Sequence, residues 1–184
     1  MGIELKTMSL RAFFAMLIMV LLPMVPAAAA SSITWPQGWE LQQSPVPTSN
    51  SGEKFDGSNR LAVKVDKSGQ MLAVLNLIVL AIKQGDKPTL ENQTASLANT
   101  MRAAYAEKGM TPSCQEPQDT TLDGFPARQM RCTVLKDKAD VLEQLLIVTI
   151  GRHTVQALSL TASPANFKTY EPDFMATRDS LRVD

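Results

Sequence analysis

Two runs of apolar residues constrain the fold more than any other feature of this sequence. The first is MLAVLNLIVLAI at residues 71–82, in which Asn76 is the only polar residue, and the second is VLEQLLIVTI at residues 141–150. A strand that is apolar on both sides must be covered on both faces. The first run is also too short to cross a membrane as a helix. We therefore expect two central strands with other elements packed on either side, and a buried helix is the alternative for residues 71–82.

Shorter alternating patterns around these runs predict an antiparallel sheet. Residues 60–66 place three apolar side chains on one face and lead into the first run through a Lys-Ser-Gly-Gln turn. Residues 154–162 follow the second run after a Gly-Arg-His turn, and residues 39–41 continue a Trp-Pro-Gln-Gly turn as a short strand. The two cysteines lie on a further hairpin. Consecutive hairpins of this kind are typical of antiparallel sheets.

Two helices and one long loop complete the predicted elements. Thr89 is suited to cap a helix that ends near Gly109. A Ser-Pro pair at residues 163–164 starts a C-terminal helix, in which Pro172 predicts a break or kink. Residues 44–59 are rich in Pro, Ser, Gly and Asn and predict a flexible exposed loop. The order of elements predicts an α+β fold, with an antiparallel sheet of about six strands covered by helices.

The N-terminus has the three parts of a secretory signal peptide. Lys6 and Arg11 precede the apolar residues 12–25, and Ala28-x-Ala30 offers a cleavage site after Ala30. We expect residues 1–30 to be removed and the remaining chain to be periplasmic or secreted, without a stable membrane span.

Residues 31–184 are then a single domain of 154 residues. This domain carries 16 basic and 17 acidic residues, because Lys6, Arg11 and Glu4 lie in the removed segment. Nucleic-acid-binding proteins usually have a surplus of basic residues. The balanced charge therefore argues against a nucleic-acid partner.

The spacing of the two cysteines predicts a disulfide. If residues 122–124 form a three-residue hairpin loop, Thr121 pairs with Phe125, and the numbers of facing residues sum to 246. Cys114 and Cys132 also sum to 246, so they would lie opposite each other. In an oxidising compartment such a pair is normally a structural disulfide, worth about 3 kcal/mol for a loop of this length. In this register Pro117 falls at a hydrogen-bonded position, so a bulge there would change the count.

Few side chains suggest chemistry. His153 is the only histidine and lies at a predicted turn, without the partners that a catalytic or metal-bound histidine needs. No phosphate-binding glycine loop or nucleophile elbow occurs. We expect no catalytic, metal or cofactor site. The candidate binding residues are Trp35, Trp39 and Asn76, since aromatic side chains anchor ligands and a buried amide needs partners. The alternative is that the tryptophans cap the core and Asn76 is satisfied within the sheet.

The order of elements resembles the PsbP-like superfamily, which includes an extrinsic photosystem subunit, a Ran-binding Mog protein and bacterial DcrB-type envelope proteins. The resemblance rests on Trp-Pro-x-Gly-Trp at residues 35–39, Leu-Asp-Gly-Phe-Pro-Ala at residues 122–127 and Asp-Ser-Leu-Arg-Val at residues 179–183. It is greatest to small secreted proteins of unknown function from pseudomonads. The resemblance implies an αβα sandwich with binding or assembly roles and no shared catalytic residue.

Two functions fit these observations. The first is a non-catalytic periplasmic binding or accessory protein that contacts another envelope protein, either in envelope assembly or as a toxin-neutralising immunity protein. The alternative is a carrier of a small molecule or lipid, with a cavity between the sheet and a helix. An enzyme is not expected.

Overall fold

A single antiparallel sheet organises the described part of the chain. The computed structural model describes residues 32–48, 52 and 54–184, so the predicted signal peptide lies outside the described residues. The sheet has eight strands in the order β1-β2-β3-β8-β7-β6-β4, and β5 also pairs with β6. The strands are β1 (Glu40–Gln43), β2 (Gly57–Val65), β3 (Met71–Ala81), β4 (Thr111–Cys114), β5 (Gln118–Leu122), β6 (Phe125–Lys136), β7 (Ala139–Ile150) and β8 (Thr154–Ala162).

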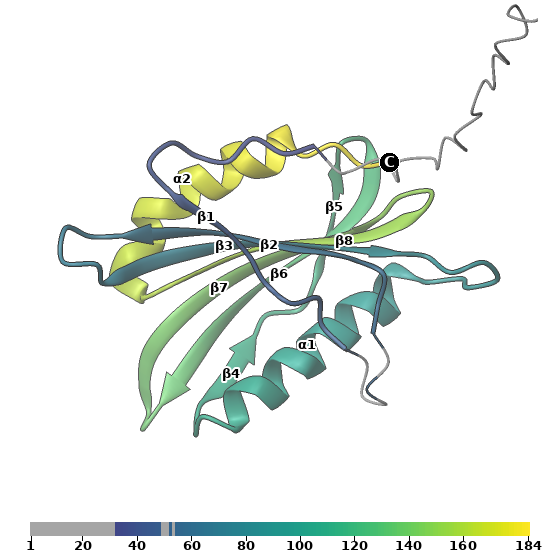
Figure 1. Ribbon diagram of the computed structural model, residues 1–184. Coiled ribbons are helices and arrows are strands. Elements are labelled where there is room, and N and C mark those ends of the chain that lie inside the picture. Colours follow the sequence, from purple (N-terminus) through teal and green to yellow (C-terminus); the bar gives the residue numbers. More distant parts are fainter. Residues whose placement is uncertain (1–31, 49–51, 53) are drawn as a thin grey trace, which may run out of the picture. The chain divides into compact units, whose positions relative to one another are not determined.

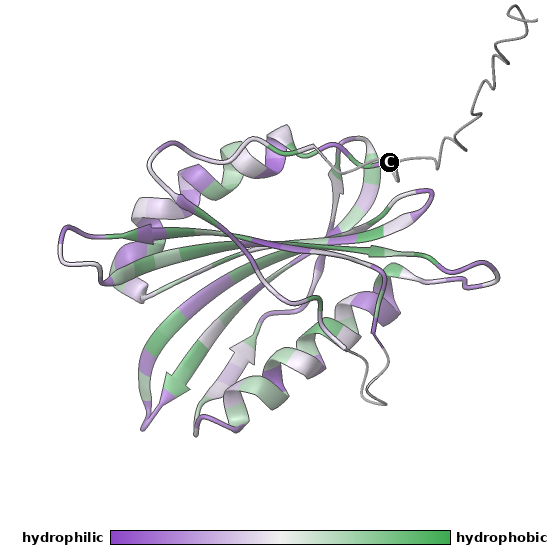
Figure 2. Cartoon of the chain, viewed as in Figure 1, coloured by the Kyte–Doolittle hydropathy of each residue, from purple (hydrophilic) through white to green (hydrophobic). Residues whose placement is uncertain are grey.

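One helix packs on each face of this sheet (Figure 1). Helix α1 (Leu90–Ala106) contacts β4, β6 and β7, and helix α2 (Pro164–Ser180) contacts β3, β7 and β8. This confirms the predicted α+β sandwich. The strand count exceeds the predicted six because the first side of the cysteine hairpin is divided into β4 and β5. Hydrophilic residues gather in the loops that join the strands (Figure 2).

The larger core lies between the sheet and α2. Phe167 and Phe174 of α2 are fully buried against central residues of β3, β7 and β8, including Leu75, Ile147 and Leu158. A smaller core lies under α1, where Ala98 meets residues such as Met130, Cys132, Leu146 and Val148. The two predicted central strands are therefore β3 and β7, and the helical alternative for residues 71–82 is wrong.

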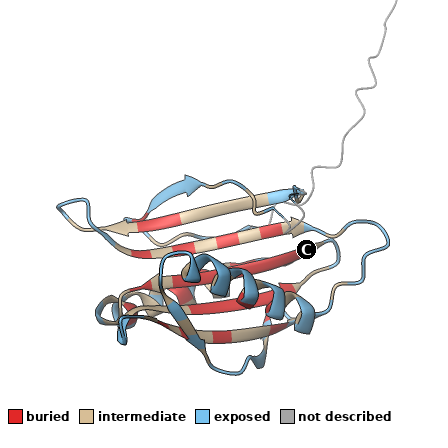
Figure 3. Ribbon diagram, turned by 90° about the horizontal axis from the view of Figure 1, so that it is seen from below, coloured by how far each residue is buried: buried red, intermediate tan, exposed pale blue. Residues whose placement is uncertain are grey.

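Strand β3 is covered unequally on its two faces. Ala73, Leu75, Leu77 and Val79 point towards α2 and are buried, whereas the alternating residues between them are only partly buried. The reason is the position of α1, which contacts β4, β6 and β7 and leaves β2 and β3 beside it (Figure 3). The sequence of β3 predicts full cover on both faces, and the structure provides it on one.

Three local predictions have different outcomes. The backbone N–H of Asn92 donates to Oγ1 of Thr89 at 3.2 Å, so the predicted cap of α1 is confirmed. The predicted break at Pro172 is wrong, because α2 runs unbroken through it. Burial of phenylalanines on both sides of the proline offsets the missing hydrogen bond. The predicted loop at residues 44–59 ends earlier, since β2 begins at Gly57, and residues 49–51 and 53 are outside the described residues.

Candidate functional site

The two tryptophans belong to the α2 side of the molecule. The side chain of Trp39 is 7% exposed, and its indole N–H donates to Oδ2 of Asp173 at 2.9 Å. Its ring meets the Tyr170 ring edge-on, with 5.5 Å between ring centroids. Trp35 is partly buried against the same core. Trp39 therefore joins the segment before β1 to α2.

Asn76 lies on the opposite face of the sheet. Its side-chain amide donates to Oδ1 of Asn59 on the neighbouring strand β2 at 2.8 Å. Its neighbours Leu75 and Leu77 point into the α2 core, so Asn76 points towards the α1 side. The structure does not bring the three predicted binding residues together.

Asn76 forms part of the floor of a groove between α1 and the sheet. The groove has a volume of about 370 Å³. Its floor comes from β2, β3, β7 and β8, and α1 forms one wall. It is lined by Leu61, Val74, Asn76, Ile78, Leu97, Thr100, Met101, Ala104, Tyr105, Lys108, Gln144, Leu146, Ala157, Ser159 and Thr161.

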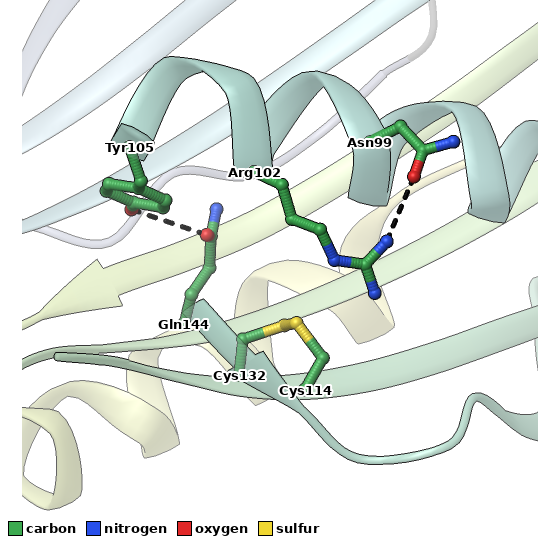
Figure 4. The surroundings of a disulfide bond; sticks show 6 residues. All are labelled: Asn99, Arg102, Tyr105, Cys114, Cys132 and Gln144. Carbon is green, nitrogen blue, oxygen red and sulfur yellow. Dashed lines mark hydrogen bonds between the residues drawn. A yellow bond between two sulfur atoms is a disulfide. The ribbon is translucent and has the colours of Figure 1, made fainter. Parts of the chain in front are cut away.

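Polar groups gather at one end of this groove. The hydroxyl of Tyr105 donates to Oε1 of Gln144 at 3.5 Å (Figure 4). Burial raises the pKa of the Tyr105 phenol above its usual value. Of the described residues that line the groove, only Lys108 carries a charge. The groove thus combines apolar walls with a few hydrogen-bonding groups and one cation, as ligand pockets do.

The polar residues of the groove floor can be found in the sequence, but no single strand shows that they lie on one surface. Asn76 faces Ser159 across the β3–β8 pair, and Gln144 faces Thr161 across the β7–β8 pair. Asn76 is the one polar residue of β3, whereas β7 and β8 carry further polar residues. The strand order places Asn76, Gln144, Ser159 and Thr161 in one groove lining. Without that order the sequence does not show that Tyr105 and Lys108 also line the groove.

The titratable side chains in the described lining of the groove are Tyr105 and Lys108. None of the described residues that line it is a histidine, cysteine, aspartate or glutamate. His153 is exposed in the β7–β8 turn. In the described ranges no cluster of three or more His, Cys, Asp and Glu side chains could hold a metal ion. The apolar walls and the few hydrogen-bonding groups of the groove suit the binding of a ligand.

A disulfide joins β4 to β6 beside α1 (Figure 4). Cys114 and Cys132 have their Cα atoms 4.0 Å apart, and both pack in the α1 core. The predicted three-residue loop is nevertheless wrong. Leu122 pairs with Phe125, which leaves a two-residue turn whose residues have φ values of 50° and 81°. Two positive φ values are typical of the type I′ turn that an Asp-Gly pair forms.

A bulge restores the cysteine pairing. Gln118 pairs with Gln129, but the backbone N–H of Gln115 donates to the carbonyl of Arg131 at 2.9 Å. Three steps along one strand therefore match two steps along β6. The extra residue lies next to Pro117, which has no N–H and cannot fill a hydrogen-bonded position in the ladder. The shorter turn and the bulge cancel, so the cysteines still face each other.

Comparison with solved structures supports the fold. The solution structure of cyanobacterial PsbP (CyanoP) from Synechocystis sp. PCC 6803 superposes with a TM-score of 0.62 and 15% identity, covering 84% of this chain and 87% of that chain. This confirms the PsbP-like fold. It is evidence for the fold alone, because the sequence identity is low.

Two further structures are less similar. PA94 from Pseudomonas aeruginosa, described as a protein of unknown function and putative regulator, has a TM-score of 0.45 and 16% identity, covering 84% of this chain and 97% of that chain. LpqN, involved in cell envelope biogenesis of Mycobacterium tuberculosis, has a TM-score of 0.49 and 15% identity, covering 83% and 82%.

Sequence comparison places the chain in a family. No curated protein matches the sequence. The model of the family described as "Domain of unknown function (DUF4946)" matches residues 30–183, which is most of the chain. This protein therefore belongs to the DUF4946 family.

Proposed function

We propose that this protein is a non-catalytic binding protein of the bacterial periplasm and that the groove between α1 and the sheet holds its ligand. The groove itself carries the proposal, since it has apolar walls, hydrogen-bonding groups at one end and a single cation. The described lining holds no histidine, cysteine, aspartate or glutamate.

The proposed location rests on two features of the chain. The apolar segment at residues 12–25, followed by Ala28-x-Ala30, predicts cleavage before Ser31. The Cys114–Cys132 disulfide is stable in an oxidising compartment such as the periplasm. Among the described residues no helix has the length and apolar character needed to cross a membrane. N-terminal sequencing of the exported protein should read Ser-Ser-Ile-Thr, and full-length protein in the membrane fraction would contradict this part of the proposal.

The groove favours a carrier over an adaptor that works only through protein contacts. A carrier needs a cavity between sheet and helix, and the groove has that position and about 370 Å³ of volume. An adaptor for another envelope protein, in assembly or toxin neutralisation, needs an exposed docking surface. The exposed large hydrophobic residues of the described chain are Leu41 and Met71, and neither lines the groove. The adaptor function is the second candidate and would use a different surface.

Native mass spectrometry of protein purified from the periplasm tests this proposal. We expect the wild-type protein to carry a small molecule that organic extraction removes. Ala104 lines the groove, and its neighbour Ala103 on the same helix is exposed and does not. Ala104→Trp should abolish the retained mass, whereas Ala103→Trp should keep it. A protein that carries no small molecule, or that loses it equally in both variants, would contradict the carrier function.

A further inference from the structure

A second hollow lies nearer the N-terminal end of α1 than the groove does. It has a volume of about 460 Å³, and it is lined by residues from β3, β8, the start of α1 and the segment before β2. Its apolar lining includes Phe55, Leu80, Ile82 and Val155. Phe55 is partly buried and comes from the segment that precedes β2.

The groove and this hollow follow one another along the same three elements. On β3, Ile78 lines the groove and Leu80 lines the hollow, two residues further along the same face. On β8 the corresponding step is from Ala157 to Val155. On α1 it is from Leu97 to Gln93, which is one helical turn. All three steps lead in one direction, so the two hollows lie in line between α1 and the sheet, and together they are called the trench.

The trench is long enough for an acyl chain. Its floor extends from Val74 of β3 to Ile82, one residue past the end of the strand, and these eight steps span roughly 26 Å. One leaflet of a bilayer, which an acyl chain crosses, is half of a hydrocarbon core of about 30 Å. The trench therefore exceeds the length of the acyl chains found in membrane lipids.

The charges along the trench are unevenly placed. Among the described residues that line the groove, Lys108 alone is charged, and it lies three residues after Tyr105, whose hydroxyl contacts Gln144. The second hollow has Lys83, Asp86 and Lys87 at its lining, all of them exposed. Long lysine side chains can lay their alkyl parts over an apolar ligand while the ammonium groups stay in water. The end near Lys108 thus suits an anionic headgroup, and the rest of the trench suits its chain.

We infer that the ligand is a single-chain anionic amphiphile, with its headgroup at Lys108 and its acyl chain extending over Ile78 into the hollow lined by Leu80 and Phe55. This inference rests on the proposed binding function and names the ligand class for the same groove. A free fatty acid and an anionic lysophospholipid share this chemistry. Both have one acyl chain and one negative headgroup, and titration with each of them distinguishes the two.

Calorimetric titration of the ligand-free protein tests the length of the trench. We expect the affinity to rise from octanoate through dodecanoate to palmitate. Gln93→Trp places a bulky ring in the second hollow, so the gain should stop at a shorter chain. Ser96→Trp lies on the same helix, is exposed and lines neither the groove nor the second hollow, so it should behave as wild type. An affinity that does not depend on chain length, or equal behaviour of the two variants, would overturn the inference.

Lys108→Gln tests the headgroup. We expect about a tenfold loss of affinity for palmitate, as for one charge-assisted contact, and no change for the neutral hexadecanol. Lys67→Gln, in the β2–β3 turn, is the matched control and should leave both affinities unchanged. Parallel titrations with palmitate and lysophosphatidylglycerol show which source binds more tightly. An equal loss for palmitate and hexadecanol would contradict the placing of the headgroup.

The two proposals fail in different ways. If the purified protein retains a small molecule that Ala104→Trp removes, but neither palmitate nor lysophosphatidylglycerol binds, the groove is a binding site and the ligand class is wrong. If no small molecule is retained and neither amphiphile binds, both proposals are wrong.

Discussion

The indole N–H of Trp39 donates a hydrogen bond to the carboxylate of Asp173 at 2.9 Å. This contact joins residues 134 positions apart and fastens the segment before β1 to the middle of α2. It lies one residue after Pro172, where α2 lacks a backbone hydrogen bond. On the α2 side the segment before β1 therefore packs against the helix. On the α1 side, β2 and β3 line an open groove.

Trp39→Phe should lower the free energy of unfolding by about 1–3 kcal/mol, since the Asp173 carboxylate loses a partner and the ring becomes smaller. Urea unfolding measures the change. Leu41→Ala is the control, because Leu41 is 61% exposed and its loss should cost less than about 0.5 kcal/mol. In a double-mutant cycle with Asp173→Ala the two effects should not add. Strict additivity would show that the hydrogen bond contributes nothing.

Replacing both Cys114 and Cys132 by serine should cost roughly 2–4 kcal/mol and lower the melting temperature by about 5–15 °C. The fold should persist, because the cores on both faces consist mainly of aliphatic and aromatic residues. Circular dichroism gives both results. Thiol labelling of unfolded, unreduced wild-type protein should find no reactive cysteine, and two labelled thiols would contradict the disulfide.

Gly124→Val should destabilise the protein by about 1–3 kcal/mol, because φ at this position is +81° and a β-branched residue resists that conformation. Thermal unfolding measures the loss. The informative counterpart is Lys138→Gly in the β6–β7 turn, where a non-glycine residue has φ of +68°. That change should leave stability unchanged or raise it. A tolerated valine at position 124 would mean that the turn can adopt another conformation.

Tyr105 predicts a loss of stability at alkaline pH. Burial raises its pKa above the usual value of about 10, so the unfolded chain releases this proton at a lower pH than the folded protein does. The folded state then binds more protons than the unfolded state, and stability falls as pH rises above about 10. Tyr105→Phe should remove this part of the decline in urea unfolding at several pH values. An identical decline in the variant would contradict the burial of the phenol.

His153→Ala should leave both ligand binding and stability unchanged, because His153 is exposed in a turn and lines neither the groove nor the second hollow. Native mass spectrometry and thermal unfolding check the two quantities. A variant that folds normally but no longer retains its ligand would show that the histidine takes part in binding.

Much of the fold follows from local patterns in the sequence. The apolar runs at residues 71–82 and 141–150 became β3 and β7, and Thr89 caps α1. The register near the cysteines did not follow, because the Asp-Gly turn is one residue shorter than predicted and the bulge at Pro117 compensates for it. A bulge depends on the partner strand, which local patterns do not reveal.

The groove was harder to predict than the fold. The apolar residues of β3 indicate burial on both faces, yet the position of α1 depends on how Ala98 packs against β6 and β7. That packing involves residues far apart in the sequence. The polar residues Asn76 and Gln144 lie on different strands and line the same groove only through the order β3-β8-β7. The sequence did not show whether the tryptophans are core or binding residues, because aromatic side chains occur in both cores and ligand sites.

Nuclear magnetic resonance of the isotope-labelled protein, recorded with and without its retained ligand, tests the central claim most directly. The side-chain amides of Asn76 and Gln144 and the methyl group of Met101 report on the groove. The indole of Trp39 reports on the opposite face. We predict that removing the ligand shifts the first three signals and leaves the Trp39 indole unchanged. Shifts at Trp39 without shifts at Asn76 and Gln144 would show that the ligand binds elsewhere and that the groove is not its site.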